Sequence, residues 1–296
     1  MSELLQQLIN GLALGAIYAL IALGYTMVYG VLRFINFAHS DVFMVGAFAG
    51  YFLARVVPGG SIGAGIVILI GAMAVCALLG VVIEKLAYRP LRGRSTLTVL
   101  ITAIGVSLLL QNVGQRIFGA NPRSFPSIFP VHQFHFGGIV LSSTQILVFV
   151  VTLVLLFLLR YIVLHTRIGT AMRALSFNPT AASLVGINND RVISFTFALG
   201  SALAAAGGIL YASNYPSIDP LMGTLPGMKA FVAAVLGGIG NIAGAAVGGL
   251  VLGMVETTVV GFGGSTNLDT VAFAVLILIL LLRPEGLLGK RTAEKV

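Results

Sequence analysis

Charged residues and cysteine are both scarce in this sequence. Only 9% of its 296 residues are charged, whereas soluble domains carry about 25%. Hydrophobic residues make up 58%, and the mean hydropathy is +1.04. Because such a chain cannot cover a water-facing surface, we expect it to lie in a lipid bilayer. Cys76 is the one cysteine, which excludes an intrachain disulfide and a cysteine metal site.

Motifs for catalysis and for nucleotide binding are also missing. The sequence has no GxxxxGK(S/T) loop to hold ATP, no HExxH zinc motif and no GxSxG nucleophile motif. His132 and His135 share one loop, but two histidines alone do not predict a metal site. We therefore expect a protein that is not an enzyme and that binds no cofactor or metal of its own.

Nine apolar runs fill most of the chain. A membrane span needs about 20 residues to cross a hydrocarbon core of about 30 Å. The run Met228–Leu236 would cover only about 14 Å, and the glycine-rich GGIGN of residues 237–241 interrupts it. The runs are Ile9–Tyr29, Val42–Val57, Ile62–Ile83, Leu97–Phe118, Ser142–Leu159, Val192–Tyr211, Met228–Leu236, Ala243–Val260 and Leu268–Leu282. The sequence predicts an all-α polytopic membrane protein, one domain over residues 1–296, with 8 or 9 membrane segments. Met228–Asn241 is either broken or re-entrant.

Basic residues gather in three short segments, which predicts the orientation. Glu84–Arg94, residues 160–191 and the tail Arg283–Val296 hold twelve of the 17 lysines and arginines. The positive-inside rule places all three in the cytoplasm, together with the C-terminus. The N-terminus and the loops Pro58–Ser61, Gly119–Leu141 and Ser213–Gly227 then lie outside. Since the net charge of +8 is explained in this way, we expect no nucleic-acid partner.

The polar segment Leu164–Arg191 has the signals of a short helix outside the membrane. Asn178 is a good N-cap, Pro179 follows at the first helical position, and Gly186 suits a left-handed turn at the end. The pattern predicts a helix over Pro179–Val185. A helix held in this way between two spans suits docking on another protein.

Several polar residues fall within or beside the apolar runs, where they are costly and often functional. Glu256 is interpreted either as a pathway or inter-helix hydrogen-bonding group, or as a carboxylate near the outer interface. Asn36, His39 and Asp41 form either a pathway or hinge cluster or, for the last two, an interfacial histidine and a helix cap. Lys229 is expected at the outer interface. Glycines four residues apart, as in Gly244–Gly253, predict close helix packing.

Four stretches together resemble one transporter family. They are ALIALGYTMVYGVLRFINFAHSDVFMVGAF, IEKLAYRPLRG, RALSFNPTAASLVGINNDRVISFTFALGSALAAAGGIL and MKAFVAAVLGGIGNIAGAAVGGLVLGMVE. In this order they resemble the LivH-like permease subunits of branched-chain amino-acid ABC importers, over almost the whole chain. Ser40 stands where the family more often has glycine.

The resemblance implies a permease that moves leucine, isoleucine and valine across a bacterial inner membrane by alternating access. Its partners would be a second homologous permease, two cytoplasmic ATP-binding subunits that bind the ATP, and a periplasmic substrate-binding protein. The segment Arg173–Asn188 resembles the family's coupling loop. Urea or short amides are alternative substrates, and a stand-alone secondary transporter or channel is an alternative mechanism. Neither the substrate pocket nor a homodimeric or heterodimeric state is visible in the sequence.

Two sets of candidate site residues follow. Those expected to couple to the ATPase are Arg173, Asn178, Pro179, Ala182, Ser183, Gly186, Ile187 and Asn188. Those expected in the translocation pathway or a hinge are Asn36, His39, Asp41, Gly237, Gly238, Asn241 and Glu256.

Overall fold

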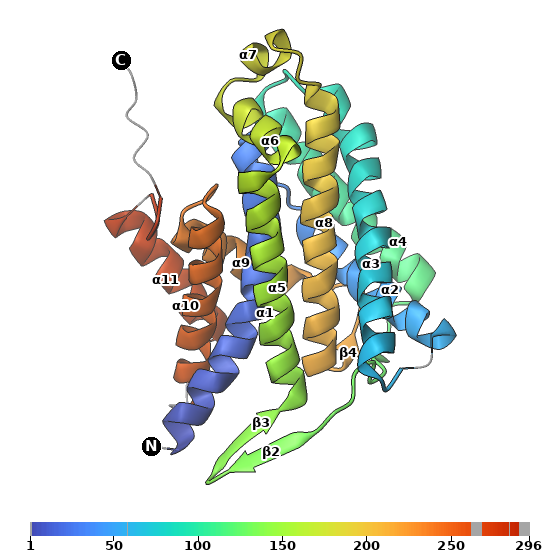
Figure 1. Ribbon diagram of the computed structural model, residues 1–296, viewed down its shortest axis with the longest axis vertical. Coiled ribbons are helices and arrows are strands. Elements are labelled where there is room, and N and C mark those ends of the chain that lie inside the picture. Colours follow the sequence, from blue (N-terminus) through green and yellow to red (C-terminus); the bar gives the residue numbers. More distant parts are fainter. Residues whose placement is uncertain (1, 58, 262–267, 284, 290–296) are drawn as a thin grey trace.

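The computed structural model of the chain describes residues 2–57, 59–261, 268–283 and 285–289. Within them, each of the nine apolar runs corresponds to one helix of a bundle (Figure 1). These helices are α1 (Ser2–Leu32), α2 (His39–Val56), α3 (Ile62–Ile83), α4 (Thr96–Phe118), α5 (Ser143–His165), α8 (Asn189–Asn214), α9 (Thr224–Gly237), α10 (Ile242–Gly261) and α11 (Leu268–Leu282). Six of the helices in the described ranges are long and apolar enough to cross a membrane, and α9 is a shorter apolar helix. The all-α, polytopic prediction is confirmed.

Polar caps at several helix ends explain where those helices begin. The Ser61 side chain accepts a hydrogen bond from the Ala64 N–H at the start of α3, and Ser95 does the same for the Thr98 N–H of α4. Ser142 and Gln145 form a capping box at the start of α5. These bonds satisfy backbone donors that have no partner within the first turn of a helix.

Helix α1 lies at the centre of the bundle. Its residues from Ala13 to Val28 are buried, whereas α4 and α5 leave large aliphatic side chains exposed along their length. Helix α10 packs along α1 through glycine. A Cβ atom on Gly249 would lie 2.4 Å from the Ala19 N atom, and one on Gly253 would lie 2.3 Å from the Gly15 N atom. The glycine spacings therefore allow close packing of helices, as predicted.

The short run beginning at Met228 becomes the 14-residue helix α9, which starts earlier, at Thr224. Fourteen residues rise about 21 Å, less than a full hydrocarbon core. The chain then turns at Gly238, whose φ is +101°, and α10 runs back along α9. The segment Met228–Asn241 is thus one short helix followed by a tight turn.

Loops predicted to lie outside meet at one end of the bundle, where Gln6 near the start of α1 also lies. Strand β1 (Arg123–Ser124) pairs with β4 (Ser217–Ile218), and β2 (Gln133–Phe136) forms a hairpin with β3 (Ile139–Ser142). Gly60 N–H donates to the Ile128 carbonyl, and Gln6 exchanges two hydrogen bonds with the Val140 backbone. The sequence analysis did not predict these short strands.

Two of the basic segments meet at the opposite end. Residues 84–91 continue α3 as a π-helical turn, η1 (Glu84–Tyr88), and a 3₁₀ turn, η2 (Arg89–Leu91). The polar segment after α5 forms two helices, α6 (Arg167–Phe177) and α7 (Pro179–Leu184), where the sequence predicted one. Lys290, Arg291 and Lys295 of the basic tail lie outside the described residues.

Candidate functional site

A buried ion pair joins α9 to α10. Lys229 Nζ lies 2.5 Å from Glu256 Oε1, and the Tyr18 hydroxyl on α1 donates to Glu256 Oε2 at 2.9 Å. Lys229 is 7% exposed and Glu256 is 5% exposed. The expectation that Lys229 lies at an interface is wrong, because its ammonium is paired inside the protein. Glu256 serves as an inter-helix hydrogen-bonding group rather than an exposed interfacial carboxylate.

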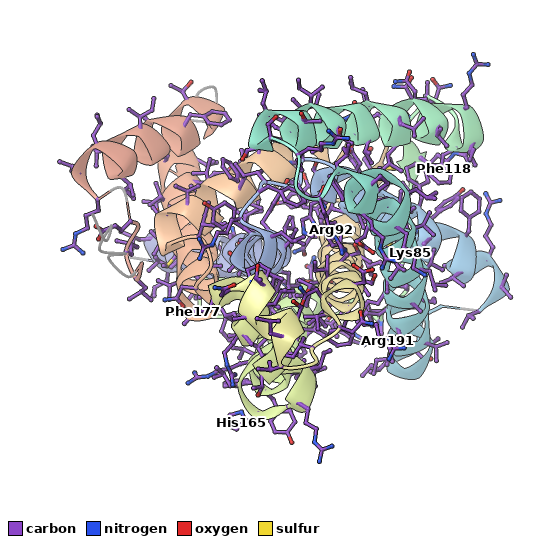
Figure 2. All side chains as sticks on the ribbon, turned by 90° about the horizontal axis from the view of Figure 1, so that it is seen from above. Lys85, Arg92, Phe118, His165, Phe177 and Arg191 are labelled. Atoms are coloured by element: carbon purple, nitrogen blue, oxygen red, sulfur yellow. The ribbon has the colours of Figure 1, made fainter. Side chains whose placement is uncertain are left out.

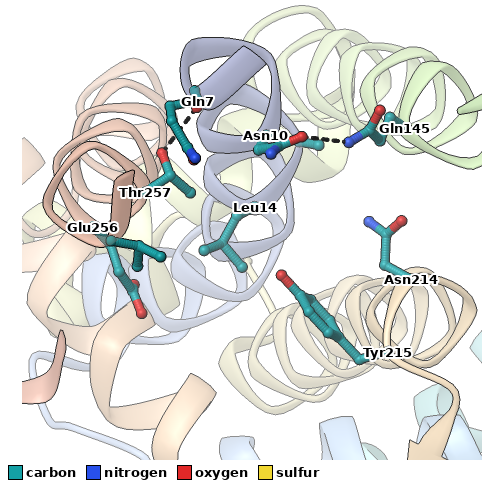
Figure 3. A pocket seen from close by; sticks show the side chains of 10 residues that line it. Gln7, Asn10, Leu14, Gln145, Asn214, Tyr215, Glu256 and Thr257 are labelled. Carbon is teal, nitrogen blue, oxygen red and sulfur yellow. Dashed lines mark hydrogen bonds between the residues drawn. The ribbon is translucent and has the colours of Figure 1, made fainter. Parts of the chain in front are cut away.

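A polar cavity of about 380 Å³ opens beside this pair, between α1, α5, α10 and the end of α8 (Figure 3). Its polar lining consists of Gln7, Asn10, Gln145, Asn214, Tyr215, Glu256 and Thr257, and its apolar lining of Ala13, Leu14 and Val260. Gln145 Nε2 donates to Asn10 Oδ1 at 2.8 Å, and Thr257 Oγ1 donates to the Gln7 carbonyl at 3.0 Å. Amides and a carboxylate in these positions can bind a polar solute. The sequence analysis found only Glu256 here.

The three polar residues before and within the first turn of α2 are all buried, but each has a different partner. Asn36 Oδ1 accepts from the Tyr88 hydroxyl at 2.6 Å, and His39 Nε2 lies 3.2 Å from the Ile21 carbonyl. Asp41 Oδ1 accepts from Gln111 Nε2 at 3.0 Å. They do not form one cluster by direct contact. They attach the start of α2 to α1, η1 and α4.

Helix α2 begins deep inside the protein. Ile21, which His39 contacts, lies eleven residues before the end of α1, or about 16 Å along the helix axis. His39 is therefore not an interfacial residue. Asp41 is not the cap of α2 either, because the helix begins at His39 and Asp41 lies in its first turn.

The start of α9 reaches the start of α2. A Cβ on Gly223 would lie 2.1 Å from the Ser40 carbonyl oxygen, and one on Gly227 would lie 2.2 Å from Ser40 Cβ. Two helices thus start side by side in the protein interior, in contact at Ser40. Discontinuous helices of this kind border the pathway in many transporters.

The turn between α9 and α10 has a packing role. A Cβ on Gly237 would lie 1.9 Å from the Gly244 carbonyl, and Gly238 would meet the backbone of Gly289. Asn241 Oδ1 accepts from the Gly244 N–H, and its Nδ2 donates to the Leu288 carbonyl at 2.7 Å. These three candidate pathway residues lie close to residues 285–289 and do not line the polar cavity.

The local geometry of α7 agrees with its sequence signals. Asn178 Oδ1 accepts from the Thr180 and Ala181 N–H groups, each at 3.0 Å. Pro179 opens the helix, and the φ of Gly186 is +85°. The Gly186 N–H bonds to the Ser183 carbonyl and the Ile187 N–H to the Ala182 carbonyl, which is a Schellman motif. The helix ends at Leu184, one residue earlier than predicted.

The candidate coupling residues divide by exposure. Arg173, Asn178, Pro179, Ser183, Gly186 and Asn188 are exposed, Ile187 is half-buried, and Ala182 is buried. Ala182 therefore packs inside the protein instead of presenting a surface. The sequence analysis missed the most exposed apolar side chains of residues 164–191, which are Phe177, Leu184 and Val185, at 87%, 82% and 76%. Figure 2, which looks down on this end, labels Phe177 at the end of α6.

A charge network fastens η1 and η2 to the start of α8. Glu84 is fully buried, and it pairs with Arg92 and with Arg89, the latter at 3.4 Å. The Ser194 hydroxyl donates to Glu84 Oε2 at 2.5 Å, and both arginines also pair with Asp190. The network links the loop after α3 to the helix that follows α7. The sequence analysis counted these charges only as an orientation signal.

The comparisons with known proteins agree on one family. The model of the family described as "Branched-chain amino acid transport system / permease component" matches residues 7–282. The chain is 43% identical to the high-affinity branched-chain amino acid transport system permease protein BraD of Pseudomonas aeruginosa, over 99% of this chain and 98% of that protein. It is 41% identical to the corresponding protein LivH of Escherichia coli, over 99% and 97%.

A solved structure, PsaBC from Streptococcus pneumoniae in complex with Fab, superposes with a TM-score of 0.47 at 14% identity, covering 96% of this chain and 91% of that one. The sequence matches extend over nearly the full length of the chain. This chain therefore belongs to the family of permease components of the branched-chain amino acid transport system.

Proposed function

We propose that this chain is the membrane-spanning permease subunit of an ATP-driven importer of the branched-chain amino acids. The observation that carries the proposal is the identity of 41–43% over nearly the whole length to high-affinity permeases for these substrates. A bundle with at least six apolar spans in its described part supports a role in translocation. Residues 1–296 act as one permease domain.

Energy enters from other subunits in this proposal. The chain lacks an ATP-binding loop of its own, so two cytoplasmic ATP-binding subunits supply the hydrolysis and hold the ATP. They dock on α6 and α7, where the apolar side chains of Phe177, Leu184 and Val185 project outward. A periplasmic binding protein delivers the amino acid at the opposite end, and a second homologous permease completes the pathway.

The charge network between the η1–η2 turn and α8 supports a route by which motion of the ATPase subunits reaches the membrane helices. When the ATPase subunits close, α7 moves with them, and the short connection to α8 passes the displacement on. Asp190 and Ser194 on α8 contact the η1–η2 turn through Arg89, Arg92 and Glu84. Helices α3 and α8 would then move together, so that the access of the pathway alternates between the two sides.

The proposed orientation of the chain in the membrane follows from the distribution of its basic residues. The end with α6, α7, η1 and η2 faces the cytoplasm, and the end with the β-hairpin faces the periplasm. The N-terminus then lies outside, and the C-terminus lies inside, in the plasma membrane of a bacterium.

Reconstitution tests this function directly. The chain is purified with the proteins that accompany it, and uptake of radiolabelled leucine into vesicles is measured with and without ATP. ATP-dependent leucine uptake that needs a P-loop ATPase subunit supports the proposal. Uptake by the chain alone without ATP would favour a secondary transporter, and ATP-dependent uptake of urea but not leucine would move the substrate to the amide class.

A further inference from the structure

The polar cavity beside Glu256 has the chemistry to hold a zwitterion, and we propose that it is a membrane-embedded binding site for the backbone of the transported amino acid. The inference rests on the proposed function, and it names a site within this chain. In this site Glu256 holds the α-ammonium, the amides of Asn10 and Asn214 hold the α-carboxylate, and Leu14 and Val260 contact the aliphatic side chain.

Glu256 provides the negative charge. A carboxylate has about four lone-pair positions for hydrogen bonds. Lys229 and the Tyr18 hydroxyl occupy one on each oxygen, so the carboxylate can accept an ammonium donor as well. Glu256 is one of the residues that line the cavity. The substrate's ammonium can therefore reach the carboxylate while the ion pair with Lys229 stays in place.

Amide groups provide the donors for the substrate's carboxylate. Asn10 accepts hydrogen bonds from Gln6 and Gln145 through its Oδ1. Among the described residues, its Nδ2 donates no hydrogen bond, and the side-chain amide of Asn214 makes none. Figure 3 shows the Asn10 and Asn214 side chains on the side of the cavity away from Glu256. A zwitterion between them meets a negative group at one end and N–H donors at the other.

The size and the apolar part of the lining fit the same class of solute. The cavity measures about 380 Å³, which places it in the lower part of the range for small-molecule sites. Leu14 comes from α1 and Val260 from α10, and both line the cavity. Burying a leucine side chain against such groups contributes favourable free energy, while the charged ends fix its orientation. Urea can donate N–H groups to Glu256, but it has neither a carboxylate for the amide donors nor an aliphatic side chain for the apolar lining.

Protection of a reporter thiol tests the site independently of transport. Val260→Cys is made in a Cys76→Ala background. The matched control is Val131→Cys, an exposed valine just before β2, which lies at the same end of the bundle as the end of α10 (Figure 1). The importer is assembled with its permease and ATPase partners but without the binding protein. The rate of maleimide labelling is then measured against rising concentrations of leucine, isocaproate, isoamylamine and urea.

We expect leucine to slow labelling of Val260→Cys and leave Val131→Cys unchanged. Isocaproate lacks the ammonium and isoamylamine lacks the carboxylate, so each should protect at least tenfold less well. Asn214→Leu, which leaves the ion pair intact, should raise the half-protecting leucine concentration about tenfold or more. The site is overturned if Val260→Cys does not label, if leucine gives no protection, or if isocaproate, isoamylamine or urea protects as well as leucine does.

Leucine uptake by the complete importer that carries the unmodified chain, measured in membranes of the same composition, separates the two hypotheses. Leucine uptake without protection of the Val260→Cys thiol refutes this site and leaves the proposed function standing. No leucine uptake refutes the proposed function itself.

Discussion

Lys229 on α9 and Glu256 on α10 form an ion pair with 2.5 Å between Nζ and Oε1, and both side chains are less than a tenth exposed. A lone charge in a membrane interior is costly, and pairing removes much of that cost. The two residues are 27 positions apart and meet because α9 and α10 fold back on each other. The pair adds a charged contact to a helix interface in which Gly248 lies against Ala233 and Gly244 against Gly237.

We expect Lys229→Met to destabilise the protein more than the double variant Lys229→Met with Glu256→Gln. The single change leaves Glu256 as a buried charge without its cation, which costs about 3–5 kcal/mol. In the double variant the glutamine keeps an acceptor for Tyr18 and carries no charge. Thermal unfolding of the purified protein in detergent measures both, and a double variant no more stable than the single one would refute the pairing.

Gly249→Ala should loosen the contact between α1 and α10. The added methyl would lie 2.4 Å from the Ala19 N atom, so the helices must move apart. Overpacking of this kind costs about 1–3 kcal/mol. Gly105→Ala on α4 is the matched control, because a Cβ there meets nothing within 4 Å. The same unfolding measurement should show a lower Tm for the first variant only, and equal effects would contradict the packing.

Within the charge network at the α6–α7 end, Glu84 should contribute more to the stability of the protein than Asp190 does. Glu84 is fully buried, and its loss takes the buried carboxylate from two arginines, whereas Asp190 is 52% exposed in its side chain. A solvent-exposed ion pair contributes about 0–1 kcal/mol. Glu84→Gln is therefore expected to lower stability by more than 1 kcal/mol and Asp190→Asn by less. The reverse order in detergent unfolding would be incompatible with this network.

Phe177→Ser and Leu184→Ser are expected to reduce the amount of ATPase subunit that copurifies with the permease, by about fivefold or more. Both side chains are over 80% exposed, so their loss should leave the fold of this chain intact. Aromatic and aliphatic anchors of this kind carry much of the affinity of an interface. The control is Leu221→Ser, at 48% exposure in the loop between β4 and α9. Unchanged recovery of the ATPase from both variants would exclude α6 and α7 as its docking site.

A topology measurement tests the orientation. In a Cys76→Ala background, a cysteine at Val131 should react with a membrane-impermeant maleimide in intact cells, and one at Leu184 should react only after permeabilisation. Both positions are exposed. Val131 lies just before β2 and Leu184 ends α7, and Figure 1 shows these two elements at opposite ends of the bundle. The positive-inside rule gives the expected sides. Labelling of the Leu184 position from outside would reverse the proposed orientation.

Local signals in the sequence were enough to predict many elements. Asn178, Pro179 and Gly186 fix the limits of α7 through caps that involve only neighbouring residues. Helix α6 was missed although Thr166 caps it through the Gly169 N–H, because its eleven residues were interpreted as a polar connection. Short strands such as β1 and β4 were missed because their partners lie far apart in the chain.

The sequence by itself determined the class of the protein, its apolar segments and the grouping of its basic loops, because composition and run length decide what a bilayer accepts. Only the tertiary structure decided which apolar helix is central. A lipid-facing helix such as α5 and a buried one such as α1 are both apolar all round, so periodicity does not distinguish them.

The partner of a buried charge was likewise decided only by the fold. Lys229 alone suggested an interface, since an unpaired lysine in lipid is unfavourable. The antiparallel packing of α9 and α10 brings it to Glu256, and the positions of α1, α5 and α8 make a polar cavity beside them. Such contacts join residues that are distant in sequence, so no local pattern encodes them.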